Sequence, residues 1–213
     1  MTGPTHRQYS ISFACLAAML IFKLGISEIN YYFALPILLM ASKSGALFPD
    51  VDHNWENVHD KTVVNKIINT LIHITKGKHR SWQTHSIDIC LWSTFLGYLI
   101  PLRLYNVGIL SSTNKEVITL LLLGFNSGWI SHLFSDMLTS AGVRLFFFSK
   151  FKVKLVPKRL GKLKFNTGEQ WENFNYKVMK IINKVLGVVC IMYPLIVNGY
   201  IGYIINQLEN GGR

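Results

Sequence analysis

Long uncharged apolar runs constrain this chain more than any other feature of its sequence. A transmembrane helix needs about 20 mostly apolar residues to cross the hydrocarbon core of a bilayer. Val117–Ser135 and Val185–Leu208 come close to or exceed that length without Lys, Arg, Asp or Glu. Shorter runs are Gln8–Phe22, Ile29–Ser42 and Ile89–Leu102. These runs predict an all-α polytopic membrane helix bundle with about four or five spans.

The composition is typical of a membrane protein with a basic rim. Of the 213 residues, 50% are hydrophobic and 15% are charged, yet 22 Lys and Arg against 11 Asp and Glu give a net charge of +11. These values exclude a disordered chain, a collagen and a disulfide scaffold. The three cysteines lie singly in apolar stretches, so they indicate neither disulfides nor a thiolate zinc site. Without a repeat or a linker, residues 1–213 are predicted to form a single domain.

The distribution of positive charge predicts the orientation in the membrane. With five spans, one side holds the N-terminus and the segments 43–87 and 139–184, and it collects 18 of the 22 basic residues. Lys and Arg gather in cytoplasmic loops, so this side is predicted to face the cytoplasm. Met1–Ile26 is predicted to remain as a first helix and not to act as a secretory signal, because its apolar stretch contains Lys23 and no clear cleavage site follows.

Two segments outside the runs are predicted to lie at the membrane surface. Val63–Thr75 carries apolar residues at helical spacing and is predicted to be an amphipathic interfacial helix. Lys150–Leu155 alternates basic and apolar residues, which favours a short strand in a basic, β-like segment near 146–156. The eleven Lys and Arg residues of 144–184 are explained by topology and by attraction to anionic lipid. No nucleic-acid-binding motif accompanies them, so lipid rather than nucleic acid is the expected partner.

All seven histidines and all five aspartates lie within the first 136 residues, mostly near the predicted cytoplasmic ends of the runs. Ionisable residues at a membrane are costly unless they are paired or bind an ion, so they are candidates for function. Three groups stand out, and they are Pro49-Asp50-Val51-Asp52-His53, His79–Ser86 and Ser131–Thr139.

Asp50 and Asp52 follow the second apolar run directly. In an extended segment both carboxylates point the same way, so they could reach one cation or two neighbouring ones. Taken alone, a polar turn that caps the next helix is the favoured interpretation of such a motif.

The other two groups carry imidazoles. His79 and His85 flank a turn beside Arg80, which suits a metal and an oxyanion such as phosphate, although a solvated basic loop explains this group equally well. His132 and Asp136 stand at i and i+4 on one helix face, roughly 5–6 Å apart, where they can share a metal ion. For an isolated pair of this kind, a His–Asp hydrogen bond without metal is the favoured interpretation.

Together the three groups favour a metal site over three unrelated polar clusters. Imidazole and carboxylate ligands without thiolates suit Zn, Mn or Fe in a catalytic site with open positions. The set is large enough for one or two divalent ions. The ligands that the residues suggest are His79, His85, His132, Asp50, Asp52 and Asp136.

The same motifs, in the same order, resemble those of the YdjM family. The matching residues are Thr5-His6, Leu47–His53, His79-Arg80, Thr84–Ser86, Ser131-His132 and Asp136–Thr139 with Gly142, followed by Gly168, Gln170 and Glu172. The resemblance covers most of the chain and implies a metal-dependent hydrolase of the inner membrane. Ser140 stands where the family often has proline, but no ligand is lost.

The resemblance also implies roles for individual residues. It adds His6 to the ligands, so that the implied metal set is His6, Asp50, Asp52, His79, His85, His132 and Asp136. It implies that His53 and Glu172 add to or support this set, and that Arg80 and Thr84 contact the substrate or the ligands. The expected catalytic residues are Asp52, His53 and Arg80, with His53 or a free carboxylate accepting a proton from water and Arg80 holding an anionic group. His59 and His73 match no motif and are expected at the surface.

These observations predict a membrane-bound, metal-dependent hydrolase with its site at the cytoplasmic face of the inner membrane. The expected substrate is a small or lipid-linked molecule, and a phosphoester best suits a metal site beside a basic membrane rim. One alternative is a non-catalytic protein that binds or transports metal or lipid, although a transporter is expected to place its ligands near the bilayer midplane. Another is a soluble all-helical hydrolase, against which the length of Val185–Leu208 argues.

Overall fold

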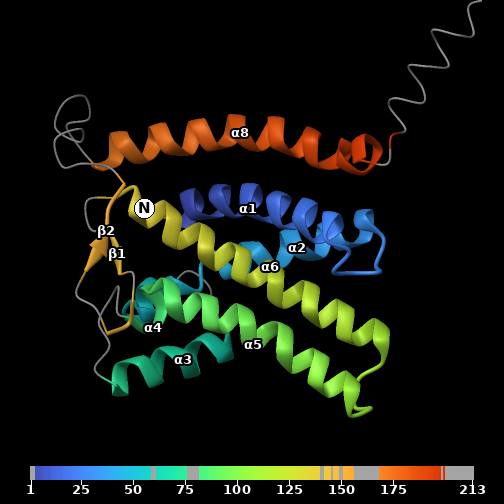
Figure 1. Ribbon diagram of the computed structural model, residues 1–213. Coiled ribbons are helices and arrows are strands. Elements are labelled where there is room, and N and C mark those ends of the chain that lie inside the picture. The colour runs from blue at the N-terminus through green and yellow to red at the C-terminus, as the bar shows by residue number, and fades with distance from the viewer. Residues whose placement is uncertain are drawn as a thin grey trace, which may run out of the picture.

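Five long helices form the body of the protein. The computed structural model describes residues 3–58, 61–75, 82–139, 142–144, 146–148, 151–155, 168–197 and 199. The long helices run alongside one another in Figure 1, and they are α1 (Gly3–Lys23), α2 (Tyr31–Gly45), α5 (Ile87–Asn106), α6 (Ser112–Met137) and α8 (Gly168–Val197). Shorter elements are η1 (Pro49–Asp52), η2 (Trp55–Asn57), α3 (Val63–Ile74), α4 (Trp82–His85), β1 (Val143–Arg144) and β2 (Lys152–Val153).

One end of this bundle gathers the short elements. In Figure 1, α4, β1 and β2 lie at the same end as the start of α1 and the start of α8. We call this the site end, because the polar motifs of the sequence fall there. Loops that join the helices at the opposite end are short, as in the link from α5 to α6.

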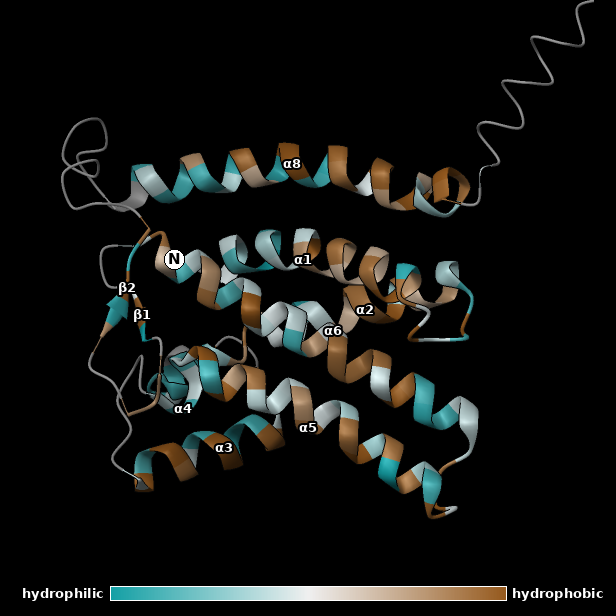
Figure 2. Cartoon of the chain, viewed as in Figure 1, coloured by the Kyte–Doolittle hydropathy of each residue, from teal (hydrophilic) through white to brown (hydrophobic). Residues whose placement is uncertain are grey.

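Four segments are long and apolar enough to cross a membrane. They are Tyr31–Asp52, Ile87–Asn106, Ser112–Met137 and Gln170–Val197. α1 does not meet the same measure among the described residues, and it packs against α2, α6 and α8. Trp92 and Phe95 on α5 are exposed, and the second half of α8 is strongly hydrophobic in Figure 2. Outward apolar side chains are what a lipid-facing helix requires, so the predicted all-α membrane bundle is confirmed.

The close packing of α2 against α6 positions the site. A Cβ atom at Gly128 would overlap the backbone of Ser42, and one at Gly45 would overlap the backbone of Phe125. Small residues at a helix crossing let two backbones approach closely, which is how many membrane helices pack. As a result, the end of α2 lies directly against the turn of α6 that follows Gly128.

α8 begins earlier than the charge pattern predicts. Residues 168–184, assigned by that pattern to a cytoplasmic loop, are helical. Tyr9 donates to Asn175 Oδ1 over 3.1 Å, and Ser12 donates to Asn183 Oδ1 over 2.6 Å. These contacts hold one side of α8 against α1, and the lysines occupy exposed positions, so charge does not end the helix. Residues 198 and 200–208 of the predicted last span lie outside the described residues.

The surface segments agree in part with their predictions. Val63–Ile74 is helical, as its periodicity predicts. Lys152–Val153 pairs antiparallel with Val143–Arg144, which confirms a short strand in the basic segment. Within the described residues, this strand is shorter than the predicted Lys150–Leu155.

Candidate metal centre

The segment that carries the two aspartates is a 3₁₀ turn, so the extended conformation in which both carboxylates would point the same way does not form. Pro49 at the first helical position favours this conformation, because its ring restricts φ to helical values. As a result, the two carboxylates have different partners. Asp50 Oδ1 lies 3.8 Å from His132 Nε2, whereas Asp52 Oδ2 lies 3.1 Å from His85 Nδ1.

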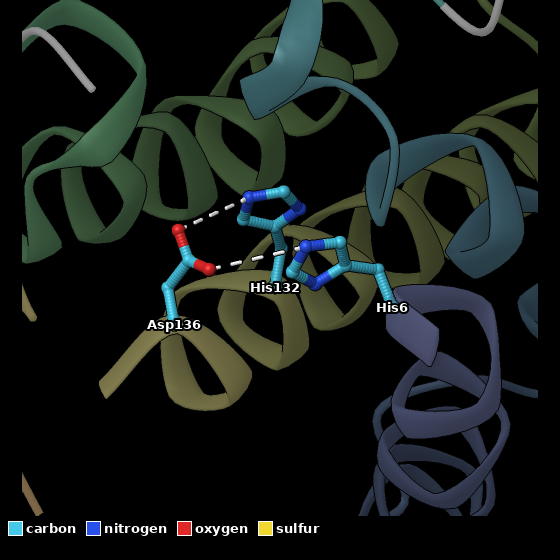
Figure 3. Close-up of side chains that lie close together, drawn as sticks. All are labelled: His6, His132 and Asp136. Atoms are coloured by element: carbon cyan, nitrogen blue, oxygen red, sulfur yellow. Dashed lines mark ion pairs between the residues drawn. The ribbon is translucent and has the colours of Figure 1, made fainter. Parts of the chain in front are cut away.

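Asp136 brings together imidazoles from three segments of the chain. Its Oδ2 lies 3.7 Å from Nε2 of His132, one turn earlier on α6, and 3.6 Å from Nε2 of His85 at the end of α4. Its Oδ1 lies 3.9 Å from Nε2 of His6 on α1, so the two oxygens face different rings (Figure 3). All four side chains are at most 2% exposed. The predicted pairing of His132 with Asp136 is therefore present, within a larger buried cluster.

His132 has a hydrogen bond that determines which of its nitrogens faces this cluster. Nδ1 donates to the carbonyl oxygen of Ala46 over 2.7 Å, so Nε2 carries the lone pair of the neutral ring. Nε2 is buried and has no hydrogen-bond partner among the described residues. It faces carboxylate oxygens of Asp50 and Asp136 at 3.8 and 3.7 Å, beyond hydrogen-bond range. A lone pair that faces two carboxylates is stabilised by a cation between them.

The spacing of the donor atoms suits a metal ion. Two sets of three could hold one, His6 with His132 and Asp136, and Asp50 with His85 and His132, and within each set the donor atoms lie within 4.8 Å of one another. Two ligands at about 2.1 Å from a tetrahedral ion lie roughly 3.4 Å apart, so small side-chain movements would complete either set. Because both sets need Nε2 of His132, they describe overlapping positions in one centre.

Thr84 and Asp52 contact His85 through Nδ1, the ring nitrogen that faces away from Asp136. Its Nδ1 lies 2.9 Å from Thr84 Oγ1, and the Thr84 hydroxyl donates to Asp52 Oδ2 over 2.8 Å. A carboxylate behind a metal-binding imidazole orients the ring and raises its basicity. Burial lowers the pKa of His85 below its usual value, and the hydrogen bond with Asp52 opposes this shift. Asp52 and Thr84 therefore orient His85, and Asp52 is in neither of the two candidate ligand sets.

Several supporting groups tie the helices together around the cluster. Ser135 Oγ contacts Nδ1 of His6 and donates to the carbonyl oxygen of His132 over 2.8 Å. Beside His6, Thr5 donates to Glu172 Oε1 over 3.1 Å and so links α1 to α8. The role of Ser135 was not predicted, although its place three residues after His132 is a usable signal. The role of the Ala46 carbonyl has no sequence signal, because every residue carries a carbonyl.

The remaining predicted residues divide into two groups. His53 is 34% exposed on its side chain, and its Nε2 lies 3.7 Å from Asp50 Oδ1, so it borders the centre on a more open side. His73 is exposed, as expected. His59, His79 and Arg80 lie outside the described residues.

Comparison with known proteins identifies the family of the chain. The family model described as YdjM inner membrane protein matches residues 1–205. No curated protein and no solved structure matches the chain. The family match spans α1 to α8 and includes both candidate ligand sets. The chain therefore belongs to the YdjM family of inner membrane proteins.

Proposed function

We propose that this protein is a membrane-bound, metal-dependent hydrolase that cleaves a phosphoester of a small or lipid-linked substrate at the cytoplasmic surface of the inner membrane. The observation that carries the proposal is Nε2 of His132. It is buried, without a hydrogen-bond partner among the described residues, and faces Asp50 and Asp136. A divalent cation would bind this nitrogen and both carboxylates at once, while the Nδ1 proton stays with Ala46.

The described residues fit a divalent metal. His6, His85, His132, Asp50 and Asp136 would hold it, and their imidazole and carboxylate donors suit Zn, Mn or Fe. A divalent metal at this position would lower the pKa of a bound water toward about 7 and polarise the scissile oxygen.

Other residues of the chain would orient a ligand, accept a proton and hold the substrate. Asp52 and Thr84 hold His85 in its ligand orientation. His53, on the more open side of Asp50, would accept the proton of the attacking water. Arg80, which lies outside the described residues, is proposed to hold the anionic group of the substrate.

The position of the cluster supports catalysis over transport. Its ligands come from the start of α1, the turn after α2, the end of α4 and the end of α6, which all lie at the site end in Figure 1. A transporter is expected to place such groups halfway along its helices. The basic residues of the site end would also favour a phosphorylated or lipid-linked substrate.

The test begins with elemental analysis of protein purified in detergent. Wild type should contain one or two equivalents of Zn, Mn or Fe, which His132→Ala should lose while still inserting into membranes. Absence of metal from wild type, even after reconstitution, would overturn the metal centre.

The hydrolase part of the proposal needs a separate measurement. Metal-loaded wild type should cleave members of a panel of phosphoesters and phospholipids, and His53→Ala should lose this activity while keeping its metal. A metal-loaded protein that cleaves none of them would leave only a metal-binding role.

A further inference from the structure

The two sides of α3 differ sharply in exposure. Asn69 and Ile72 on one side are 5% exposed. On the other side, residues spaced about one helical turn apart form a continuous apolar stripe, in which every side chain is between 56% and 76% exposed. The stripe consists of Val63, Val64, Ile67, Leu71 and Ile74.

The buried side of α3 holds the turn that carries Asp50 and Asp52. The side-chain amide of Asn69 donates to the carbonyl oxygens of Val51 and His53, the latter over 2.8 Å. The last carbonyls of a short helix have no partner within the helix and must find donors elsewhere. Asn69 supplies two such hydrogen bonds, so the position of α3 and the position of the turn are linked.

Neighbouring residues indicate that lipid covers the stripe. Tyr31–Asp52, the candidate span, ends at the turn that α3 contacts, so α3 lies beside the end of a membrane helix. The exposed Lys61 and Lys66 can reach anionic headgroups while the stripe points toward acyl chains. These features fit an amphipathic helix at the boundary between headgroups and acyl chains.

Aromatic residues on neighbouring elements support the same position for α3, at the boundary between headgroups and acyl chains. Phe146, Phe147 and Phe148 are exposed in the link between β1 and β2, and the ring of Phe147 lies 5.8 Å from that of Trp82. Gln83, next to Trp82, donates to the Thr75 hydroxyl at the end of α3 over 3.3 Å. Tryptophan is enriched at membrane interfaces, and phenylalanine is common on surfaces that insert there, so α3 and these rings would share one lipid boundary.

We propose that the apolar stripe of α3 docks into the lipid interface and that Asn69 transmits this docking to the Asp50–Asp52 turn. Lipid contact would thereby hold Asp50 toward His132 and Asp52 toward His85. The consequence for metal binding rests on the proposed function, whereas docking and its coupling to the turn do not.

The docking is tested with a fluorophore on full-length protein in nanodiscs of phosphatidylethanolamine and phosphatidylglycerol that contain doxyl-labelled lipid. Bimane is attached at Ile67→Cys and, as the matched control, at Lys66→Cys, about 100° around the helix. The three native cysteines are buried and do not compete for the label. We expect quenching by the lipid several-fold greater at position 67 than at position 66. Equal quenching, or a label at 67 that only aqueous iodide reaches, would overturn docking. A label at 67 shielded from both quenchers would show a protein occupant and would also overturn it.

The coupling is tested by amide hydrogen exchange of segment 47–53 in nanodiscs with chelator present. Asn69→Ala loses two hydrogen bonds to the turn and should speed exchange there by about tenfold, with α5 and α6 unchanged. Thr70→Ala, which loses only a bond to the carbonyl of Lys66 within α3, should change nothing in this segment. The double variant Ile67→Ser, Leu71→Ser should speed exchange in the same segment as Asn69→Ala.

Each outcome has a separate meaning. Unchanged exchange in Asn69→Ala would overturn the coupling, and unchanged exchange in the double variant would show that lipid does not hold α3. Because neither measurement depends on a bound metal, a wild type that binds no metal would overturn the proposed function and leave this inference intact. If wild type binds metal, Asn69→Ala should lose it and Thr70→Ala should keep it. A metal-loaded Asn69→Ala would overturn the link between α3 and the centre.

Discussion

The two ends of α6 both bury carboxylates, but the partners of those carboxylates differ. Near the start of the helix, Glu116 is 7% exposed, and its Oε2 accepts hydrogen bonds from the Ser27 hydroxyl and from the backbone N–H groups of Glu28 and Ile29 at 3.0–3.1 Å. Near the end of the helix, Asp136 faces imidazole nitrogens at 3.6–3.9 Å.

This difference separates a structural carboxylate from a candidate ligand. Glu116 has donors from a loop at hydrogen-bond distance, so it closes the link between α1 and α2. At the other end, nitrogen lone pairs and carboxylate oxygens converge at a spacing that suits a shared cation. A buried carboxylate is therefore not by itself a sign of a metal site. The atoms that face the carboxylate distinguish a candidate metal ligand from a structural group.

The largest expected effect is at the site end. Asp50→Ala removes a ligand of one candidate set and should weaken metal binding by more than about a hundredfold, because even residues behind the ligands can contribute up to that much. Asp88→Ala, outside both sets, is the control and should keep its metal. Metal content is measured by elemental analysis, and full metal in Asp50→Ala would show that the ligand assignment is wrong.

At the opposite end of α6, a substitution should change the stability of the protein and not its metal content. Glu116→Ala leaves two backbone N–H groups without their acceptor and should lower the free energy of unfolding by about 2 kcal/mol, while metal content stays at the wild-type level. Glu116→Gln keeps an acceptor and should cost less. Thermal unfolding in detergent, followed by a dye that reacts with the three buried cysteines, measures the change. Metal loss in a folded Glu116→Ala would show that the two ends are not independent.

A smaller effect on metal binding is expected from the residues that orient His85. Asp52→Asn keeps the size of the side chain but removes its charge, and it should weaken metal binding by about tenfold. Thr84→Ser keeps the hydroxyl that donates to Asp52 and should be close to wild type. Titration of the metal-free protein measures both affinities. A loss as large as that of Asp50→Ala would indicate that Asp52 is itself a ligand.

The smallest effect is expected on the basic surface. Lys152 is exposed on β2, so Lys152→Ala should reduce binding to anionic vesicles by about 1 kcal/mol or less and leave metal content unchanged. Vesicle flotation and elemental analysis test the two parts. Loss of metal in this variant would place the centre elsewhere.

Features that depend on residues close together in the chain could be predicted from the sequence, and features that depend on distant residues could not. The pairing of His132 with Asp136 could be predicted, because one turn of helix sets their separation. The participation of His6 required a family resemblance, since nothing near it in the sequence points to α6. The shared direction of Asp50 and Asp52 required an extended segment, and it is absent because Pro49–Asp52 forms a 3₁₀ turn, in keeping with the polar turn that the motif favours when taken alone.

The sequence by itself determined the helical membrane bundle, the amphipathic character of α3 and the polar motifs at the helix ends. The length of an uncharged run and the helical spacing of apolar residues depend only on residues close together in the chain. Both can therefore be recognised without knowing the tertiary structure. Only the tertiary structure decided that Asp50 faces His132 while Asp52 faces His85. The contact of the Ala46 carbonyl with His132 is also tertiary, since it depends on α2 approaching α6 at Gly45 and Gly128. Packing between distant segments selects these partners, and it sets which nitrogen of His132 faces the carboxylates of Asp50 and Asp136.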